Sequence, residues 1–447
     1  MAKNHRLNKN IIKHTLRRRS FSKFLRILGP GIVSGAADDD PSGVVTYSQA
    51  GAKYGFGFLW AFPFMYPMLI AVQESCSRIG AVTGKGLATI IKDNFNKKLL
   101  FLAVLLVVVA NTINIGADLG AMASTTQLFI GLPFEFLAIF YAIFIILMVI
   151  FIKYKTYARI LKWLAVSLLA YPIAALLAKS DWLEVIKNTF TIMPVINSET
   201  VYIFVGIIGT TISPYLFFWD TSEVVEEEIS NHRLLISGGL PKISKKFLRN
   251  LRIDNFLGMT LSVLTGWFIV VLCASVLNGN NITNIDSAAD AAKALEPLVS
   301  VFPYSGLIAK LIFSIGILGI GLLAVPILAG SSAYAISEVF GWREGLYRKF
   351  NKAIGFYAII IVATIVGLLI NFIGINPIQA LIFTAVFNGV AAVPLLWMIF
   401  RIGNDNNIMG QYKNGWLSKI FISITILIMT VAVLALFYFI ATDSLMF

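Results

Sequence analysis

The stretch AADDDPSG, residues 36–43, places three consecutive aspartates and a proline inside an apolar run that extends over residues 24–50. A carboxylate inside a membrane span is costly and usually marks a functional site or a water-filled cavity. Pro41 lacks an amide donor and biases Asp40 away from the helical conformation, and Gly43 weakens the helix further. The sequence therefore predicts an unwound stretch near Asp40, with free carbonyl groups that face a cavity.

A second apolar run, residues 201–230, contains a similar interruption at GIIGTTISPY, residues 206–215. Pro214 breaks the helix and biases Ser213 out of it, so that carbonyl groups near Thr210 and Thr211 lose their usual donors. The alternative interpretation is a simple kink, because proline and glycine are common in membrane helices. Interrupted segments at matching places in two halves of a chain favour a transporter site of the inverted-repeat type.

Composition places the whole chain in a membrane. Of the 447 residues, 58% are apolar and 13% charged, and the mean hydropathy is +0.81. A soluble two-domain enzyme would need more surface charge, so this class is excluded. Runs long enough to cross a bilayer recur along the chain, and they predict an all-α integral membrane protein with eleven transmembrane helices. The expected spans are 24–50, 56–78, 99–130, 134–152, 158–178, 201–230, 253–277, 306–338, 354–373, 377–401 and 416–441.

The distribution of basic residues predicts the orientation. With the N-terminus in the cytosol, the cytosolic segments hold 31 of the 36 lysines and arginines, as the positive-inside rule requires. Residues 1–23 then form a basic cytosolic arm, which membrane attraction explains more simply than nucleic-acid binding. Eleven crossings put the C-terminus outside the cytosol, in a multi-pass protein of the cell (inner) membrane.

The donors at the two breaks are oxygen atoms: the Asp40 carboxylate, the Thr210 carbonyl and the Ser213 hydroxyl. Hard cations choose such ligands, and Mg²⁺ keeps several waters, for which a small side chain at 213 leaves room. Cys76 and Cys273 lie far apart, and the three histidines lie outside the expected spans, which disfavours a Zn²⁺ or copper site. We expect Mg²⁺ or Mn²⁺ as the transported substrate and no resident cofactor.

Other polar residues are candidates for the ion path, and each has a structural alternative. An interhelical hydrogen bond is the alternative for the residues of the third and tenth spans. The acidic end of the sixth span is either an exit vestibule for cations or a solvated helix end paired with the basic loop. The path candidates are Asp38, Asp39, Thr211, Tyr215, Asp118 and Asn388, and the vestibule candidates are Asp220, Glu223 and Glu227.

These features resemble the Nramp divalent-metal transporters. The first break resembles the family's Asp-Pro-Gly-Asn signature, the second its Met-Pro-His signature, and TYSQAGAKYG, residues 46–55, the continuation of the family's first helix. The resemblance covers essentially the whole chain. It implies the LeuT-type fold, with residues 24–178 and 201–401 as two inverted five-helix repeats and residues 416–441 as an appended helix. We expect a monomer in the lipid bilayer.

The resemblance also carries over to single residues. Asp40 takes the place of the family's metal-binding aspartate, and Thr210 that of its carbonyl ligand. Gly43 stands where the family has a metal-binding asparagine, Ser213 where it has a thioether methionine, and Tyr215 where it has a histidine. Compared with the family, the set implied by the resemblance keeps the aspartate and the carbonyl ligand. It lacks the asparagine side chain, because glycine has no side chain to offer, and it lacks the soft thioether.

Two further positions concern protons. The family's aspartate in the third helix corresponds to Asp118, but its glutamate one turn later corresponds to Ala121, and the ninth span lacks the family's basic pair. These losses resemble the Nramp-related magnesium transporter branch, in which metal selectivity is broadened and proton coupling is lost. We therefore expect voltage-driven transport of Mg²⁺ and Mn²⁺ by alternating access, without obligatory proton coupling.

Four other functions are weighed against this expectation. A proton-coupled Mn²⁺/Fe²⁺ symporter is the main alternative, and Asp118 keeps it open. An amino-acid carrier on the same fold is disfavoured, because three aspartates at the break would repel a substrate carboxylate. An intramembrane enzyme is disfavoured because adjacent acids on one broken helix lack the paired-helix arrangement of such proteases, and a metal sensor because the chain shows no soluble output domain.

Overall fold

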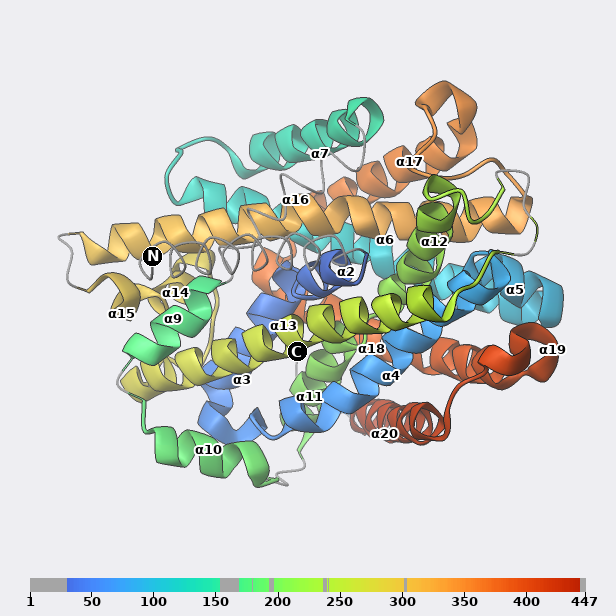
Figure 1. Ribbon diagram of the computed structural model, residues 1–447. Helices are drawn as coiled ribbons and strands as arrows, with labels where there is room; N and C mark the ends of the chain where they lie inside the picture. Colours follow the sequence, from blue (N-terminus) through green and yellow to red (C-terminus); the bar gives the residue numbers. More distant parts are fainter. Residues whose placement is uncertain are drawn as a thin grey trace, which may run out of the picture.

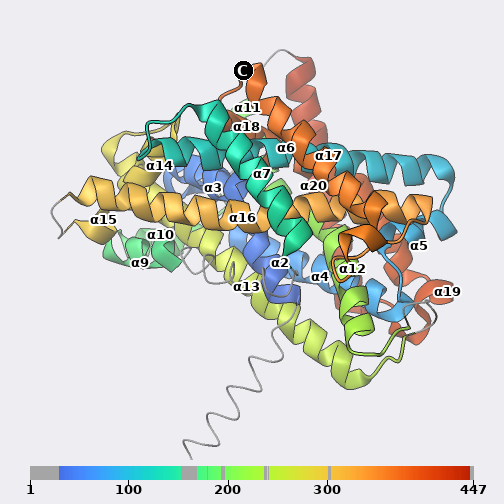
Figure 2. The ribbon, with the colours of Figure 1, turned by 90° about the horizontal axis from the view of Figure 1, so that it is seen from above.

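The computed structural model describes residues 30–152, 169–178, 180–192, 197–235, 239, 241–300 and 304–442. The expected basic arm, residues 1–23, and most of the expected span 158–178 lie outside these described residues. Within them every regular element is a helix and no strand occurs, and long helices run side by side through the molecule (Figures 1 and 2).

Both expected breaks are present. The first helix is divided into α2 (Pro30–Asp38) and α3 (Pro41–Tyr54), and the sixth into α11 (Ser198–Thr211) and α12 (Pro214–Ser230). The other helices are α4 (Ala61–Thr83), α5 (Leu87–Asn94), α6 (Lys97–Gln127), α7 (Phe134–Phe151), α9 (Ala170–Leu177), α10 (Trp182–Phe190), α13 (Lys245–Val276), α14 (Ala288–Lys293), α15 (Glu296–Val299), α16 (Ser305–Phe340), α17 (Ile354–Ile370), α18 (Pro377–Asn404), α19 (Asn406–Met409) and α20 (Trp416–Ala441).

Eight segments of the described chain are by themselves long and apolar enough to cross a membrane, and nine if one bent pair is counted as a further span. They correspond to the expected third, fourth and sixth to eleventh spans. In the bent pair, residues 41–58 turn through 111° into α4, the expected second span. The first expected span is not among the eight, because each of its two halves, α2 and α3, is short. The fifth expected span lies mostly outside the described residues.

The helix boundaries follow from local chemistry. Asp40 caps α3 with its side chain and Pro41 occupies the first turn, where its missing donor costs nothing. Pro214 starts α12 in the same way. Ser244 caps α13 at the amide of Phe247, so this helix begins at Lys245, earlier than the expected 253, and the polar first turns extend it beyond the apolar run.

Glycines allow the broken first helix to pack closely against α13. A Cβ on Gly35 would lie 2.3 Å from the carbonyl oxygen of Gly258, and one on Gly51 would lie 2.6 Å from that of Val270. Small residues at such crossings let helix backbones approach, which is the usual way for helices to associate in a membrane. In Figures 1 and 2, α2 and α3 accordingly lie next to the long α13.

Candidate metal site between the broken helices

Asp40 lies in the first break with an extended backbone, φ −64° and ψ 171°, and is 1% exposed. Its Oδ1 accepts hydrogen bonds from the amide of Gly43 at 2.9 Å and from the hydroxyl of Ser42 at 2.5 Å. These donors fix the orientation of the carboxylate. A carboxylate offers about four lone-pair sites, so lone pairs remain for a cation.

Asn114 on α6 completes the support of Asp40. Its Nδ2 donates to Oδ2 of Asp40 at 2.8 Å, and the amide side chain is 0% exposed. The sequence reasoning did not select this residue. A signal was present, because Asn114 lies four residues before Asp118 and therefore on the same face of α6.

Each proline of the two breaks removes the amide donor of one carbonyl group four residues earlier. In the first helix this carbonyl belongs to Ala37, and the hydroxyl of Tyr215 donates to it at 2.7 Å. In the sixth helix it belongs to Thr210, and the hydroxyl of Ser213 donates to it at 2.6 Å. Side chains thus replace the lost backbone donors, and Tyr215 joins α12 to the end of α2.

The two breaks face one another. The Ser42 and Thr210 hydroxyl oxygens lie 3.5 Å apart, and those of Tyr47 and Thr211 form a hydrogen bond of 2.8 Å. A Cβ on Gly43 would lie 3.0 Å from Oγ1 of Thr210 and 3.6 Å from the carbonyl oxygen of Asp38. The structure therefore brings together Asp40, Gly43, Thr210 and Ser213, the four residues proposed as the metal site.

Asp38 and Asp39 point to a different neighbour. The hydroxyl of Ser262 on α13 donates to Oδ2 of Asp38 at 2.6 Å and lies 3.3 Å from Oδ1 of Asp39. All three side chains are at most 1% exposed. The three consecutive aspartates therefore diverge, with Asp40 held from α6 and the other two facing α13.

Asp118 and Asn388 are buried polar groups of another kind. Both side chains are 0% exposed, and neither the carboxylate oxygens of Asp118 nor the amide of Asn388 has a hydrogen-bond partner in the described structure. Burying an unpaired polar group is costly, so such a group in a native protein calls for a functional or solvation explanation. Both remain candidates for the ion path.

The three proposed vestibule residues differ in their surroundings. Asp220 is 1% exposed and accepts a hydrogen bond from the Ser34 hydroxyl of α2. Glu223 is 8% exposed, whereas Glu227 is partly exposed and accepts a 3.3 Å hydrogen bond from Asn231 at the end of α12. Asp220 therefore links α12 to α2.

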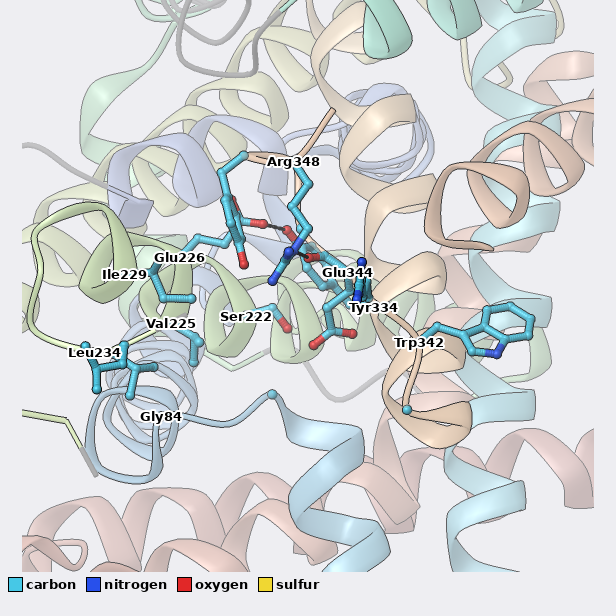
Figure 3. Close-up of a pocket in the computed structure, with 16 residues that line it drawn as sticks. Gly84, Ser222, Val225, Glu226, Ile229, Leu234, Tyr334, Trp342, Glu344 and Arg348 are labelled. Carbon is cyan, nitrogen blue, oxygen red and sulfur yellow. Dashed lines mark hydrogen bonds between the residues drawn. The ribbon is translucent and has the colours of Figure 1, made fainter. Parts of the chain in front are cut away.

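A cavity of about 300 Å³ lies on another face of α12, between this helix, the end of α16 and the following loop (Figure 3). The lining residues of α12 are Ser222, Val225, Glu226 and Ile229, so the three proposed vestibule residues do not line it. Glu226 accepts hydrogen bonds from the hydroxyl of Tyr334 and, at 2.7 Å, from the amide of Leu346.

Glu344 in the loop after α16 also lines this cavity, beside Arg348 (Figure 3). Burial away from water, with a smaller contribution from the negative charges of Glu338 and Glu226, raises the pKa of Glu344 to about 10. At neutral pH this side chain is therefore protonated in the folded protein.

The donor set at the breaks suits a hard cation. It comprises one carboxylate, a backbone carbonyl and small hydroxyl side chains, which are the ligands that Mg²⁺ and Mn²⁺ share. Among the described residues, no three His, Cys, Asp or Glu side chains gather as a metal-binding cluster. The candidate site would therefore leave coordination positions to water, as partly hydrated ions require.

Two helices interrupted opposite one another, with a buried carboxylate where they meet, are typical of multi-pass membrane transporters. A family model described as "Nramp: Natural resistance-associated macrophage protein-like" matches residues 31–439, and the chain belongs to this family. The resemblance inferred from the sequence is confirmed.

Similar proteins agree with this assignment. A protein of Bacillus subtilis (strain 168) named "Divalent metal cation transporter MntH" is 26% identical over 93% of this chain and 92% of its own. The Eremococcus coleocola manganese transporter superposes with a TM-score of 0.69 at 17% identity, over 92% and 86% of the two chains. MhsT in complex with L-phenylalanine superposes with a TM-score of 0.57 at 12% identity, over 92% and 98%. These likenesses confirm the LeuT-type fold.

Proposed function

We propose that this protein transports divalent metal ions across a cell membrane by alternating access, with Mg²⁺ and Mn²⁺ as favoured substrates and without obligatory proton coupling. The observation that carries the proposal is the Asp40 carboxylate, held in the first break by Ser42, Gly43 and Asn114. Two of these residues, Ser42 and Gly43, lie next to Thr210 of the second break. The names of similar proteins, a divalent metal cation transporter and a manganese transporter, support the substrate class.

The preference for Mg²⁺ and Mn²⁺ follows from the ligands. Ser213 presents a hydroxyl, whose proton is used on the Thr210 carbonyl and whose lone pairs remain for an ion or its water. Soft metals gain most from sulfur or imidazole ligands, and the proposed set of Asp40, Gly43, Thr210 and Ser213 offers oxygen atoms alone. A partly hydrated hard cation is thereby favoured over Cu⁺ or Zn²⁺.

The surroundings of the site support the proposal of transport without protons. Tyr215 uses its hydroxyl to satisfy a backbone carbonyl, and a phenol is a poor proton carrier near neutral pH. Ala121 has no titratable group one turn after Asp118. The alternative is a proton-coupled Mn²⁺/Fe²⁺ symporter, and the buried, unpartnered Asp118 is the observation that favours it.

The site lies within one chain, so a monomer suffices, and the chain is proposed as a carrier with no catalytic residues. We place the N-terminus in the cytosol and the C-terminus outside it, with residues 24–178 and 201–401 as the two inverted repeats and helix 416–441 appended.

Flux into proteoliposomes tests the proposal. The full chain would be reconstituted with a pH dye and a metal dye inside, and a potassium gradient with valinomycin would set the membrane potential. We expect Mg²⁺ and Mn²⁺ influx that rises with inside-negative potential while the internal pH stays constant. Asp40→Ala should abolish the flux of both ions.

Two outcomes would contradict different parts of the proposal. Internal acidification in proportion to metal influx would replace the uncoupled mechanism by symport. Undiminished metal flux through Asp40→Ala would show that Asp40 is not part of the metal site. Asp118→Asn would separate the mechanisms, because it should leave uncoupled flux electrogenic and unaccompanied by protons but should abolish proton movement in a symporter.

A further inference from the structure

Two of the three consecutive aspartates take no part in holding Asp40, and they face α13. Asp38 is 0% exposed and Asp39 1% exposed. Within the described part of the chain, neither is joined to a lysine, arginine or histidine by an ion pair. Two buried carboxylates side by side repel one another, and this arrangement requires a compensating positive charge or a proton.

The one hydroxyl group that reaches both Asp38 and Asp39 cannot satisfy both carboxylates at once. Ser262 carries a single hydroxyl proton, yet it lies 2.6 Å from Oδ2 of Asp38 and 3.3 Å from Oδ1 of Asp39. It can donate to only one of them at a time. The other oxygen of Asp38, Oδ1, is buried and has no hydrogen-bond partner. An unpaired carboxylate oxygen, fully enclosed next to a second carboxylate, is an open ligand position.

The face of α13 supports this assignment. Gly258, Ser262 and Gly266 follow one another at intervals of four residues and so form one stripe along the helix. A Cβ on Gly35 would meet Gly258, and one on Gly266 would lie 2.6 Å from Phe62 and 2.9 Å from Tyr47, so this stripe packs against α2, α3 and α4. Ser262 is the polar member of the stripe, and it is placed at the break.

The geometry points to a second divalent-cation position, formed by the carboxylates of Asp38 and Asp39 with the Ser262 hydroxyl as a neutral oxygen ligand. It is distinct from the position at Asp40, whose carboxylate is held from the opposite partner, Asn114 of α6. Two carboxylates neutralise one divalent ion, and all ligands are hard oxygen atoms. The inference rests on the proposed function in one respect, the divalent charge of the ion.

The position of these residues suggests what the second position does. Asp38 ends α2 and Asp39 directly follows it; α2 is the half of the first helix that leads toward the N-terminus, which the proposed topology places in the cytosol. An ion leaving Asp40 toward the cytosol therefore meets Asp38 and Asp39 next. We infer that the second position is one that the ion occupies during release, and when both positions are filled each ion is held more weakly because the two ions repel one another.

Counting bound Mn²⁺ tests the inference. Purified full chain would be titrated with Mn²⁺, and free Mn²⁺ measured by electron paramagnetic resonance. We expect two ions per wild-type chain at saturation, one for Asp40→Ala, and one for the double variant Asp38→Asn with Asp39→Asn. Dipolar broadening between the two bound ions should appear in the wild type and vanish in both variants.

A milder single substitution provides a second test in case the double variant does not fold. Ser262→Ala removes one neutral ligand and should weaken the second Mn²⁺ about tenfold while leaving the first unchanged. The matched control is Ser275→Ala. Ser275 is a partly buried serine of the same helix that is hydrogen-bonded to Ser180, and its substitution should change neither affinity.

The outcomes separate the two proposals. One Mn²⁺ per wild-type chain, with the same count in the Asp38/Asp39 double variant, would overturn the second position and leave the first intact. Equal affinities in Ser262→Ala and wild type would overturn it as well. Mn²⁺ binding that is the same in Asp40→Ala as in wild type would instead contradict the proposed function.

Discussion

At the scale of single residues, the two breaks are stabilised by side-chain hydroxyl groups, which replace the backbone hydrogen-bond donors that proline lacks. The carbonyl groups of Ala37 and Thr210 lose their backbone donors to Pro41 and Pro214, and the hydroxyl groups of Tyr215 and Ser213 take over. An unpaired carbonyl in a water-poor interior would cost several kcal/mol. The breaks can therefore persist in the membrane without a bound ion to pair every group.

Tyr215→Phe should destabilise the protein, because it leaves the buried carbonyl of Ala37 without a donor. The expected loss is about 1–3 kcal/mol in the free energy of unfolding. Thermal unfolding of the purified protein in detergent measures it. Tyr438→Phe is the control, since Tyr438 is 65% exposed on α20, and it should have little effect. Equal stability of the two variants would show that the Tyr215 hydrogen bond contributes nothing.

The raised pKa of Glu344 predicts how the free energy of unfolding changes with pH. Its pKa is about 10 in the folded protein and near 4.3 in an unfolded chain. The folded state thus keeps a proton that the unfolded chain releases, so the free energy of unfolding falls as pH rises between these values. Glu344→Gln should weaken this fall.

The measurement is the melting temperature between about pH 5 and pH 9, where the charge of unfolded Glu344 is nearly complete. The variant should be slightly more stable than the wild type at the acidic end, and this difference should widen toward the alkaline end. Parallel curves would mean that Glu344 ionises in the folded protein.

At the scale of helices, the proposed site depends on close approach between the two broken helices and their neighbours. Gly35 meets Gly258 of α13, and Gly209 of α11 meets Gly389 of α18, where a Cβ would lie 2.4 Å from the Gly389 amide. Both contacts are backbone to backbone, so a side chain could be accommodated only by moving a helix. Helix positions near the breaks are therefore fixed by small residues.

Gly35→Ala should be destabilising by about 1–3 kcal/mol, because the new methyl group would overlap the Gly258 carbonyl and push α2 from α13. Transport should fall as well, since α2 carries Asp38 and leads into Asp40. Thermal unfolding and metal flux measure the two effects. Gly131→Ala is the control, because a Cβ there meets nothing within 4 Å. Wild-type behaviour of Gly35→Ala would show that α2 and α13 are not tightly packed.

At the scale of the whole molecule, charge and burial are arranged for a membrane. Large apolar side chains are exposed along the outer helices, for example on α7 and α20, where lipid would cover them. The polar groups of the proposed site are enclosed, with Asp40, Thr210 and Ser213 at most 1% exposed. The structure therefore shows the breaks closed off from solvent, one of the states that alternating access needs.

Cysteine labelling tests the orientation. Native Cys76 and Cys273 are 0% exposed, so added cysteines would dominate the reaction with a membrane-impermeant maleimide. Asn280→Cys should be labelled in intact cells, because it follows the seventh expected span, 253–277, which ends outside the cytosol when the N-terminus is inside. Gln411→Cys should be labelled only after permeabilisation. Both positions are exposed in the structure. The reverse pattern would invert the proposed topology.

Much of the fold was readable from the sequence because its causes are local. Apolar runs predicted the long helices within a few residues at most ends, and Pro41 and Pro214 predicted both breaks, since a missing amide donor acts within one helical turn. Asp40, Thr210 and Ser213 were selected for the same reason, whereas Gly43 was selected only through the resemblance to the Nramp family. The start of α13 was missed because its first turns are polar and held by the Ser244 cap rather than by hydrophobicity.

The partners of the break were decided by the tertiary structure alone. Asn114 reaches Asp40 across 74 residues of sequence, Tyr215 reaches Ala37 across 178, and Ser262 reaches Asp38 across 224. Such contacts depend on which helices lie side by side and on their rotation, and neither is contained in the hydrophobic pattern of a single helix. The sequence determined that a carboxylate would stand in a gap; the packing of α6, α12 and α13 determined what holds it, and which way each aspartate faces.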